Sequence, residues 1–211
     1  TTTADDNAFV LVPNTKTAGK PWYTNKHNYA HNITLDNCVF SSTAPGYEEV
    51  AVRVTSAAGA YNVTINNCKG DSLHSLAQFT GTTGATITND TVTKSESFIN
   101  VSGGAGTFNV SNCKFTTDAA IATGYAVREN GESTAVINLD NNEFIKGGDV
   151  LVMGKGSSVT KGTINVTSGF YEGNISKTSA ATGTFVFTGG TFSEPKATVD
   201  SYCAPGYYAI E

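Results

Sequence analysis

The chain of 211 residues is long enough for one domain with a sizeable core. Charged residues make up only 15% of it, a composition that with abundant Gly, Thr, Ser and Asn favours strands and turns over helices. The formal net charge is −5, and lysine and arginine form no cluster, which argues against a nucleic-acid partner. No apolar run approaches the length of a membrane span, so we expect no membrane insertion.

Residues 1–32 lack the repeat that fills most of the chain, and they contain its only tryptophan, Trp22, beside Tyr23. Stacked strands need a cover at their open end, because exposed strand edges promote aggregation. We therefore predict an N-terminal cap over residues 1–32. The alternative, in which Trp22 and Tyr23 stack on a sugar ring, stays open.

One short pattern recurs from residue 33 to residue 192. Its clearest copy runs from Phe108 to Phe115, and the other copies start at Ile33, Val63, Ala85, Ile137, Ile164 and Phe185. Apolar and polar residues alternate in each copy, which is the period of a strand with one buried face. The alternation then breaks at residue types that tolerate a left-handed backbone, so the chain is expected to bend there. These residues are Asn37, Asn67, Asp90, Asn112, Asn141, Ser168 and Gly189.

Two rows of inward-pointing residues follow from these bends. The first row is predicted to contain Cys38, Cys68, Thr91, Cys113, Asn142, Gly169 and Gly190. The second lies two residues later and contains Phe40, Phe115, Phe144, Tyr171 and Phe192. Successive members of the first row are 21 to 30 residues apart. Irregular insertions within a fixed core pattern indicate a solenoid whose coils stack in parallel, with loops between the strands.

This repeat resembles the right-handed parallel β-helix of the pectin-lyase-like superfamily over roughly residues 33 to 192, on its pattern rather than on a catalytic motif. The resemblance implies an all-β fold: a right-handed parallel β-helix (β-solenoid). We expect about seven coils in a single domain, 1–211, with the cap at 1–32, coils at 33–192 and a second cap at 193–211.

The closing segment resembles the ends of uncharacterised surface β-helix proteins from gut bacteria. It contains Gly-Gly-Thr-Phe-Ser from Gly189 and Tyr-Cys-Ala-Pro-Gly-Tyr from Tyr202. The resemblance implies an extracellular or cell-surface location, in a chain that is part of a longer surface protein.

The four cysteines permit disulfides on paper, but their positions favour thiols. Cys38, Cys68 and Cys113 share one inward row, and a bridge between in-register parallel neighbours would be strained. We expect them to be reduced, buried groups. Cys203 lies outside the row, and its redox state stays open.

A second strand precedes each rung, and its alignment predicts two polar columns. The outward column contains Arg53, Gln78, Asn100, Arg128, Met153 and Ser176. Four residues earlier in each copy lie Glu49, His74, Glu96, Gly124, Asp149 and Glu172. In register, His74 lies about 4.8 Å from the rungs of Glu49 and Glu96.

These columns supply the candidate ligand-binding residues, which are Glu49, Arg53, His74, Gln78, Glu96, Asn100 and Arg128. They could hold sugar hydroxyls or a divalent cation, for which calcium is the candidate; no metal is assigned and no other cofactor is expected. A solvated edge whose charges discourage strand pairing is the alternative.

An apolar row lies between the two columns, and its direction is ambiguous. It contains Ala51, Leu76, Phe98, Ala126 and Leu151, and its neighbour contains Val52, Ala77, Ile99, Val127, Val152 and Ile175. Strict alternation turns the first row outward, whereas a bend turns it into the core. Both alternatives stay open.

No catalytic signature stands out. Asp36 and Asp140 are four rungs apart, about 19 Å, which is too far for the paired carboxyl groups of a glycosidase. We therefore expect a non-catalytic, adhesin-like module that binds a glycan or a surface protein. Two alternatives remain: a polysaccharide lyase or hydrolase that uses Glu49, His74, Glu96 and Arg53, and a purely structural stalk.

Overall fold

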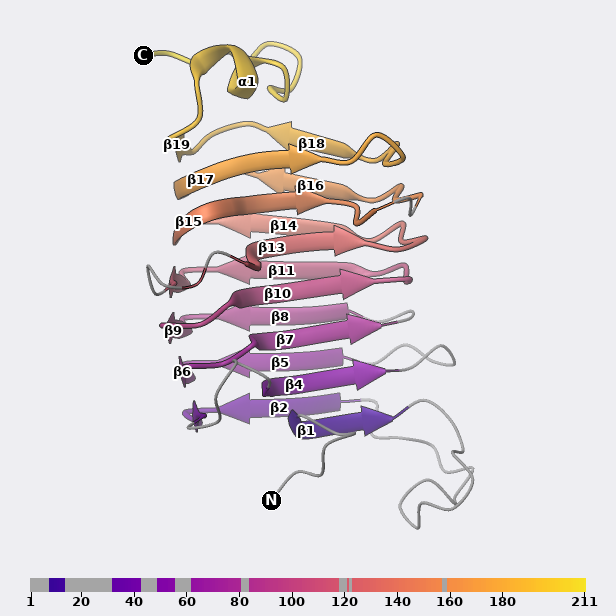
Figure 1. Ribbon diagram of the computed structural model, residues 1–211, viewed down its shortest axis with the longest axis vertical. Helices are drawn as coiled ribbons and strands as arrows, with labels where there is room; N and C mark the ends of the chain where they lie inside the picture. The colour runs from indigo at the N-terminus through magenta and orange to yellow at the C-terminus, as the bar shows by residue number, and fades with distance from the viewer. Residues whose placement is uncertain are drawn as a thin grey trace.

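The computed structural model is an all-β parallel solenoid of about five turns (Figure 1). It describes residues 8–13, 32–42, 49–55, 62–80, 84–117, 121, 123–156 and 159–211. The predicted fold class is confirmed, with fewer turns than the seven coils expected. One strand of each of the seven copies of the repeat stacks in one sheet, and after β19 (Thr191–Phe192) the chain leaves the coil for a helix.

The alternating segments of the repeat form a seven-stranded parallel sheet. Its strands are β2 (Asn32–Asp36), β5 (Asn62–Asn66), β8 (Gly84–Thr88), β11 (Thr107–Ser111), β14 (Val136–Asp140), β16 (Thr163–Val166) and β18 (Thr184–Phe187). Each strand pairs in register with the strand of the next coil, as Ile33 with Val63 and Phe108 with Ile137. Identical positions therefore stack in columns, as the repeat predicts.

The second sheet has twelve strands and wraps around a corner. Its long strands are β1 (Ala8–Pro13), β4 (Val50–Thr55), β7 (Ser75–Thr80), β10 (Ser97–Ser102) and β13 (Tyr125–Asn130). Its short strands are β3 (Val39–Ser41), β6 (Lys69–Asp71), β9 (Thr91–Thr93), β12 (Lys114–Thr116) and β19. The strands β15 (Asn142–Met153) and β17 (Gly169–Lys177) continue through the corner and join the two sets.

The direction of the strands gives the hand of the coil. In Figure 1 the long strands β4, β7 and β10 run from left to right in front, and β5, β8 and β11 run from right to left behind. Each turn rises toward the C-terminal end. The solenoid is therefore right-handed.

The bends lie at left-handed residues, with one correction to the predicted alignment. Asn37, Asn67, Asn89, Asn112 and Asn141 have φ between 50° and 60°. The bend of the third copy is thus at Asn89 and not at Asp90, because Thr91 pairs with Lys69 and Lys114. Asp90, rather than Thr91, occupies the inward row. Both residue types tolerate the bend, so the sequence alone left the register ambiguous by one residue.

In the last two copies the left-handed residue comes one position later than predicted. Gly169 has φ +114° and Gly190 has φ +106°, whereas Ser168 and Gly189 were expected to bend. A Cβ at Gly169 would overlap the backbone oxygen of Asn142 in the coil below. Glycine is therefore required there both for its conformation and for the close approach of the coils.

The aromatic column is confirmed. Phe115 pairs with Phe144, Phe144 with Tyr171 and Tyr171 with Phe192. The ring of Phe144 lies 5.8 Å from that of Tyr171, and Phe192 stacks on Tyr171 at 5.4 Å. Such contacts between rings add to the hydrophobic stabilisation of the core.

The ambiguous apolar row faces the core. Ala51, Leu76, Phe98 and Ala126 are fully buried, and Phe98 contacts Phe144 at 4.9 Å between ring centroids. The neighbouring row from Val52 to Val127 is also fully buried. Two consecutive inward residues require a bend in the strand, so strict alternation was the wrong alternative. In β15 the two rows contain Val150 and Leu151, one residue earlier than predicted, because Leu151 pairs with Val127.

The two ends differ from a plain coil. β1 extends the sheet by pairing with β4, although it belongs to the predicted N-terminal cap; Trp22 and Tyr23 lie outside the described residues. At the other end the helix α1 (Lys196–Asp200) buries Val199 against the core. The backbone of Phe187 accepts a bond from Ala204 and donates one to Tyr202, both 2.9 Å.

All four cysteines are unpaired thiols, as expected for Cys38, Cys68 and Cys113, and Cys203 is also free. Cys68 and Cys113 are buried as predicted, whereas Cys38 is partly exposed. In the described ranges of the chain, no helix is long and apolar enough to cross a membrane.

Candidate ligand-binding face

The outward column of the long strands is confirmed over four rungs. Arg53 pairs with Gln78, Gln78 with Asn100 and Asn100 with Arg128, so the two arginines are three rungs apart as predicted. All four side chains are partly exposed. They form a polar ladder along the outer face of β4, β7, β10 and β13.

Above Arg128 the predicted column is wrong by one residue in β15 and correct again at Ser176 in β17. Arg128 pairs with Val152, which pairs with Ser176, whereas Met153 points inward and is fully buried. The register of β15 and β17 shifts between Ile145 and Asp149 and again between Asp149 and Leu151. These irregularities add residues to the strand that a sequence alignment without gaps does not anticipate.

The second column is also confirmed in its lower half. The backbone N–H of His74 donates to Glu49 O at 2.8 Å, and that of Ser97 to His74 O at 2.9 Å, so Glu49, His74 and Glu96 lie on consecutive rungs. Asp149 and Glu172 do not belong to the column. Asp149 pairs with Tyr125, and Glu172 with Ile145, because of the same irregularities in β15.

The carboxylate of Glu96 forms the centre of the site. His74 Nδ1 lies 3.0 Å from Glu96 Oε2, and both side chains are partly exposed. His74 was also predicted to lie beside Glu49. The carboxylate of Glu49 instead accepts a hydrogen bond from Ser42 Oγ, at 2.5 Å from Oε2. The three groups are neighbours, but only His74 and Glu96 form a pair.

Tyr125 and Arg128 lie one coil above Glu96. The Arg128 guanidinium lies 3.9 Å from the centroid of the Tyr125 ring, and its Nε donates to Asn100 Oδ1 at 3.1 Å. Burial lowers the pKa of Arg128 from its usual value, and the nearby Tyr125 and Glu96 oppose this effect. Burial has the opposite effect on Tyr125: it raises the pKa of the phenol, which is therefore neutral at physiological pH.

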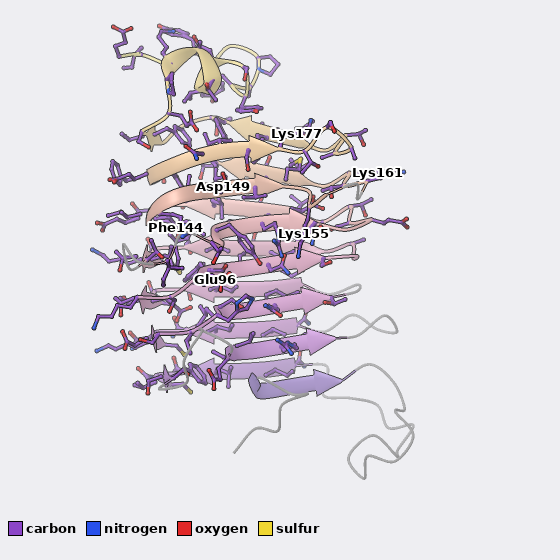
Figure 2. The ribbon with its side chains drawn as sticks, viewed as in Figure 1. Glu96, Phe144, Asp149, Lys155, Lys161 and Lys177 are labelled. Atoms are coloured by element: carbon purple, nitrogen blue, oxygen red, sulfur yellow. The ribbon has the colours of Figure 1, made fainter. Side chains whose placement is uncertain are left out.

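Lys146 is a buried cation near this face that the sequence analysis did not single out. Its side chain is almost fully buried, and Nζ donates to Ile121 O at 3.1 Å and to Thr117 Oγ1 at 3.4 Å. Burial lowers its pKa, while Glu96 and Asp149 favour its charged form. Figure 2 shows Glu96 and Asp149 on the face of the long strands. Lys146 follows the repeat by two residues. Lys94 has the equivalent position in the third copy but is exposed, so no pattern pointed to a buried cation at Lys146.

Gly124 lets the chain pack closely against Glu96. It has φ +88°, and a Cβ there would overlap both Glu96 O and Glu96 Cγ. Any side chain at this position would displace the carboxylate at the centre of the site.

A cavity of about 590 Å³ lies at the C-terminal end of the solenoid, away from the predicted columns. It is lined by the last coil and by the segment that follows α1, including Phe187, Phe192, Val199, Tyr207, Tyr208 and Ile210. Two polar groups at its edge are already engaged, since Glu194 Oε1 accepts from Ile175 N at 2.8 Å and Lys196 pairs with Asp200 at 2.5 Å.

The chemistry open to the outer face is recognition by hydrogen bonds and charge. Among the described residues, no group of three His, Cys, Asp or Glu side chains could hold a metal ion, so the calcium hypothesis gains no ligand set from them. The His74–Glu96 pair, the neutral Tyr125 and the cation of Arg128 provide donors and acceptors within three consecutive coils.

No family model matches the chain, and neither a curated protein nor a solved structure matches it. The function is therefore argued from the geometry of the outer face.

Proposed function

We propose that the chain is a non-catalytic, adhesin-like module that binds a glycan along the outer face of β4, β7, β10 and β13. The observation that carries the proposal is the polar ladder of Arg53, Gln78, Asn100 and Arg128, which repeats once per coil. The spacing of about 4.8 Å between rungs offers a regular series of donors and acceptors to a repeating polymer.

Arg128 favours a glycan that carries carboxylate or sulfate groups. Its plane is fixed on Tyr125 and its Nε is bonded to Asn100, which leaves the two terminal nitrogens for a ligand. No ion pair with Arg128 is present among the described residues. A half-buried guanidinium held in one orientation suits bidentate binding of a planar anion.

The proposal also includes the setting of the module. The repeat and the closing segment resemble pectin-lyase-like β-helices and surface proteins of gut bacteria, respectively. We therefore infer an extracellular or cell-surface location within a longer surface protein, where a second surface protein is the other candidate ligand.

Binding of the purified chain to an array of acidic and neutral glycans tests the proposal. We expect Arg128→Ala to weaken binding of an acidic glycan at least tenfold, and Arg128→Lys to restore little of it, because lysine lacks the planar fork. Lys114→Ala is the matched control, since Lys114 pairs with exposed Glu143 at 2.9 Å elsewhere on the coil. Unchanged binding by Arg128→Ala would refute this site, and absence of all glycan binding would favour a protein ligand or a stalk.

The second candidate is a polysaccharide lyase or hydrolase. The specific observation in its favour is that His74 pairs with Glu96 at 3.0 Å. The charge of that carboxylate also influences the pKa of Tyr125, Arg128 and Lys146. Such groups are the usual general acids and bases. Release of reducing or unsaturated ends in the array samples, abolished by His74→Ala and Glu96→Gln, would establish this alternative over the binding module.

A further inference from the structure

The inward row of the coils contains a repeated hydrogen bond. Cys68 Sγ donates to Leu35 O at 3.6 Å, Cys113 Sγ to Ile87 O at 3.6 Å and Asn142 Nδ2 to Val110 O at 3.0 Å. In each case the acceptor lies in the coil below, three residues before the row member of that coil. At these three positions a side-chain donor thus faces a carbonyl of the coil below. Each thiol also lies close to a carbonyl of its own coil, with Cys68 Sγ 3.3 Å from Asn66 O and Cys113 Sγ 3.2 Å from Ser111 O.

Asp90 occupies the same row but has no donor when ionised. It is fully buried, and its Oδ1 accepts from Cys68 N at 2.6 Å, as Asn142 Oδ1 accepts from Cys113 N at 3.0 Å. Its Oδ2 has no hydrogen-bond partner within the described part of the chain. By the geometry of the row, the acceptor for this position is Ile65 O, three residues before Cys68.

We propose that Asp90 holds a proton in the folded protein, that Oδ2–H donates to Ile65 O, and that loss of this proton weakens the stack of the middle coils. Asp90 is then a pH-sensitive element inside the solenoid. The carboxylic acid takes the place of the Asn142 amide, with one oxygen as acceptor and the other as donor. The carboxylate would instead be a buried charge without a counter-ion.

The surroundings of Asp90 support a neutral acid. The titratable groups that face it are the thiols of Cys68 and Cys113 on the adjacent coils, and burial raises their pKa to about 11 and about 12, so both are uncharged. No cation or second carboxyl group of the described residues contributes to its pKa. Burial raises the pKa of Asp90 to about 7, and the N–H of Cys68 only partly offsets this.

The direction of the pH dependence follows from this shift. The pKa of Asp90 is about 7 when folded and 3.8 in an ordinary environment. The folded chain therefore binds the proton more tightly than the unfolded chain, by roughly a thousandfold. The protonated Asp90 therefore contributes its full share to the free energy of unfolding below about pH 4. This contribution is lost as the pH rises to about 7, and it is absent above that pH.

Urea unfolding midpoints from pH 5 to pH 8.5 test the proposal. Glu129 is also fully buried, and burial raises its pKa to about 7, so all proteins, the parent included, carry Glu129→Gln. We expect the midpoint of the parent to fall with pH, Asp90→Asn to remove most of that fall, and Asn142→Asp to add a second one. Parallel pH profiles for the parent and Asp90→Asn would overturn the proposal.

Infrared spectroscopy gives an independent readout that needs no stability measurement. In the same background, the folded parent should show a protonated carboxyl band at pH 6 that is missing in Asp90→Asn and disappears above about pH 8. Absence of that band at pH 6 would overturn the proposal, even if the unfolding midpoints change.

Discussion

Two adjacent residues of β13 show how differently the two sides of the solenoid treat charge. Arg128 points outward, where the ring of Tyr125 and the amide of Asn100 hold it. Glu129 points inward and is fully buried, and neither carboxyl oxygen makes a regular hydrogen bond within the described ranges. On the outer side a neighbouring coil supplies a polar partner for the Arg128 cation. On the inner side the Glu129 carboxylate has no such partner, and it becomes neutral only by binding a proton.

The largest difference between the two sides is expected for aromatic residues. Phe144 is fully buried and packs against Phe98 and Tyr171, so Phe144→Ala should cost about 3–5 kcal/mol of unfolding free energy. Phe170, which points outward one residue before Tyr171 and is 38% exposed, is the matched control. Phe170→Ala should change stability by no more than about 0.5 kcal/mol in urea unfolding. Equal losses would contradict the assignment of inner and outer sides.

A second prediction concerns the buried charge of Glu129. Burial raises its pKa from 4.5 to about 7. The nearby hydroxyl of Ser133 and backbone N–H of Gly162, which make no regular hydrogen bond with the carboxyl, offset this only in part. Stability from Glu129 is therefore lost as the pH rises from about 4.5 to 7. Glu129→Gln should remove a fall of up to about 3 kcal/mol between pH 5 and pH 8, measured by urea unfolding at both values. A fall of the same size in the variant would show that Glu129 does not hold the proton.

Gly124 shows that the outer side is also tightly packed at one point, next to Glu96. Gly124 and Gly103 both have positive φ, but a Cβ at Gly103 meets nothing within 4 Å whereas one at Gly124 overlaps Glu96. Gly103→Ala should cost about 1 kcal/mol from backbone conformation alone. Gly124→Ala should cost about 2 kcal/mol more and should also weaken glycan binding, because it displaces Glu96. Similar effects of the two substitutions would mean that the contact with Glu96 relaxes freely.

The smallest effect is expected for the pair on the outer face. His74 and Glu96 are partly exposed, so their interaction should contribute less than about 1 kcal/mol to stability. A double-mutant cycle of His74→Ala and Glu96→Gln in thermal unfolding measures it. A coupling energy well above 1 kcal/mol would show that the His74–Glu96 interaction is shielded from solvent, as in the core.

Much of the fold could be predicted because the repeat fixes both the strands and the bends. The alternation from Ile33 to Phe185 and the column from Phe115 to Phe192 were predicted correctly, since every copy has to bury the same face against its neighbours. The exceptions are three bends, at Asn89, Gly169 and Gly190, each predicted one residue away. Two successive residues suit each bend, and only the structure shows which of them is left-handed.

The candidate site was predicted in part. The rungs of Glu49, His74 and Glu96 and the ladder from Arg53 to Arg128 agree with the structure. Beyond Arg128 the shifts of β15 moved Met153 inward and Asp149 into the column of Tyr125. Tyr125 and Lys146 were missed because their roles depend on contacts between coils rather than on the repeat.

By itself, the sequence determined that the chain is an all-β parallel solenoid with an aromatic column in its core, because the alternation and the bends are local and recur. Only the tertiary structure decided that the row of Ala51 and Phe98 faces inward and that Asp90 lies among the cysteines. The physical reason is the two-residue period of a strand: a single bend or one extra residue turns a side chain from solvent to core, and only pairing with the neighbouring coil fixes that register.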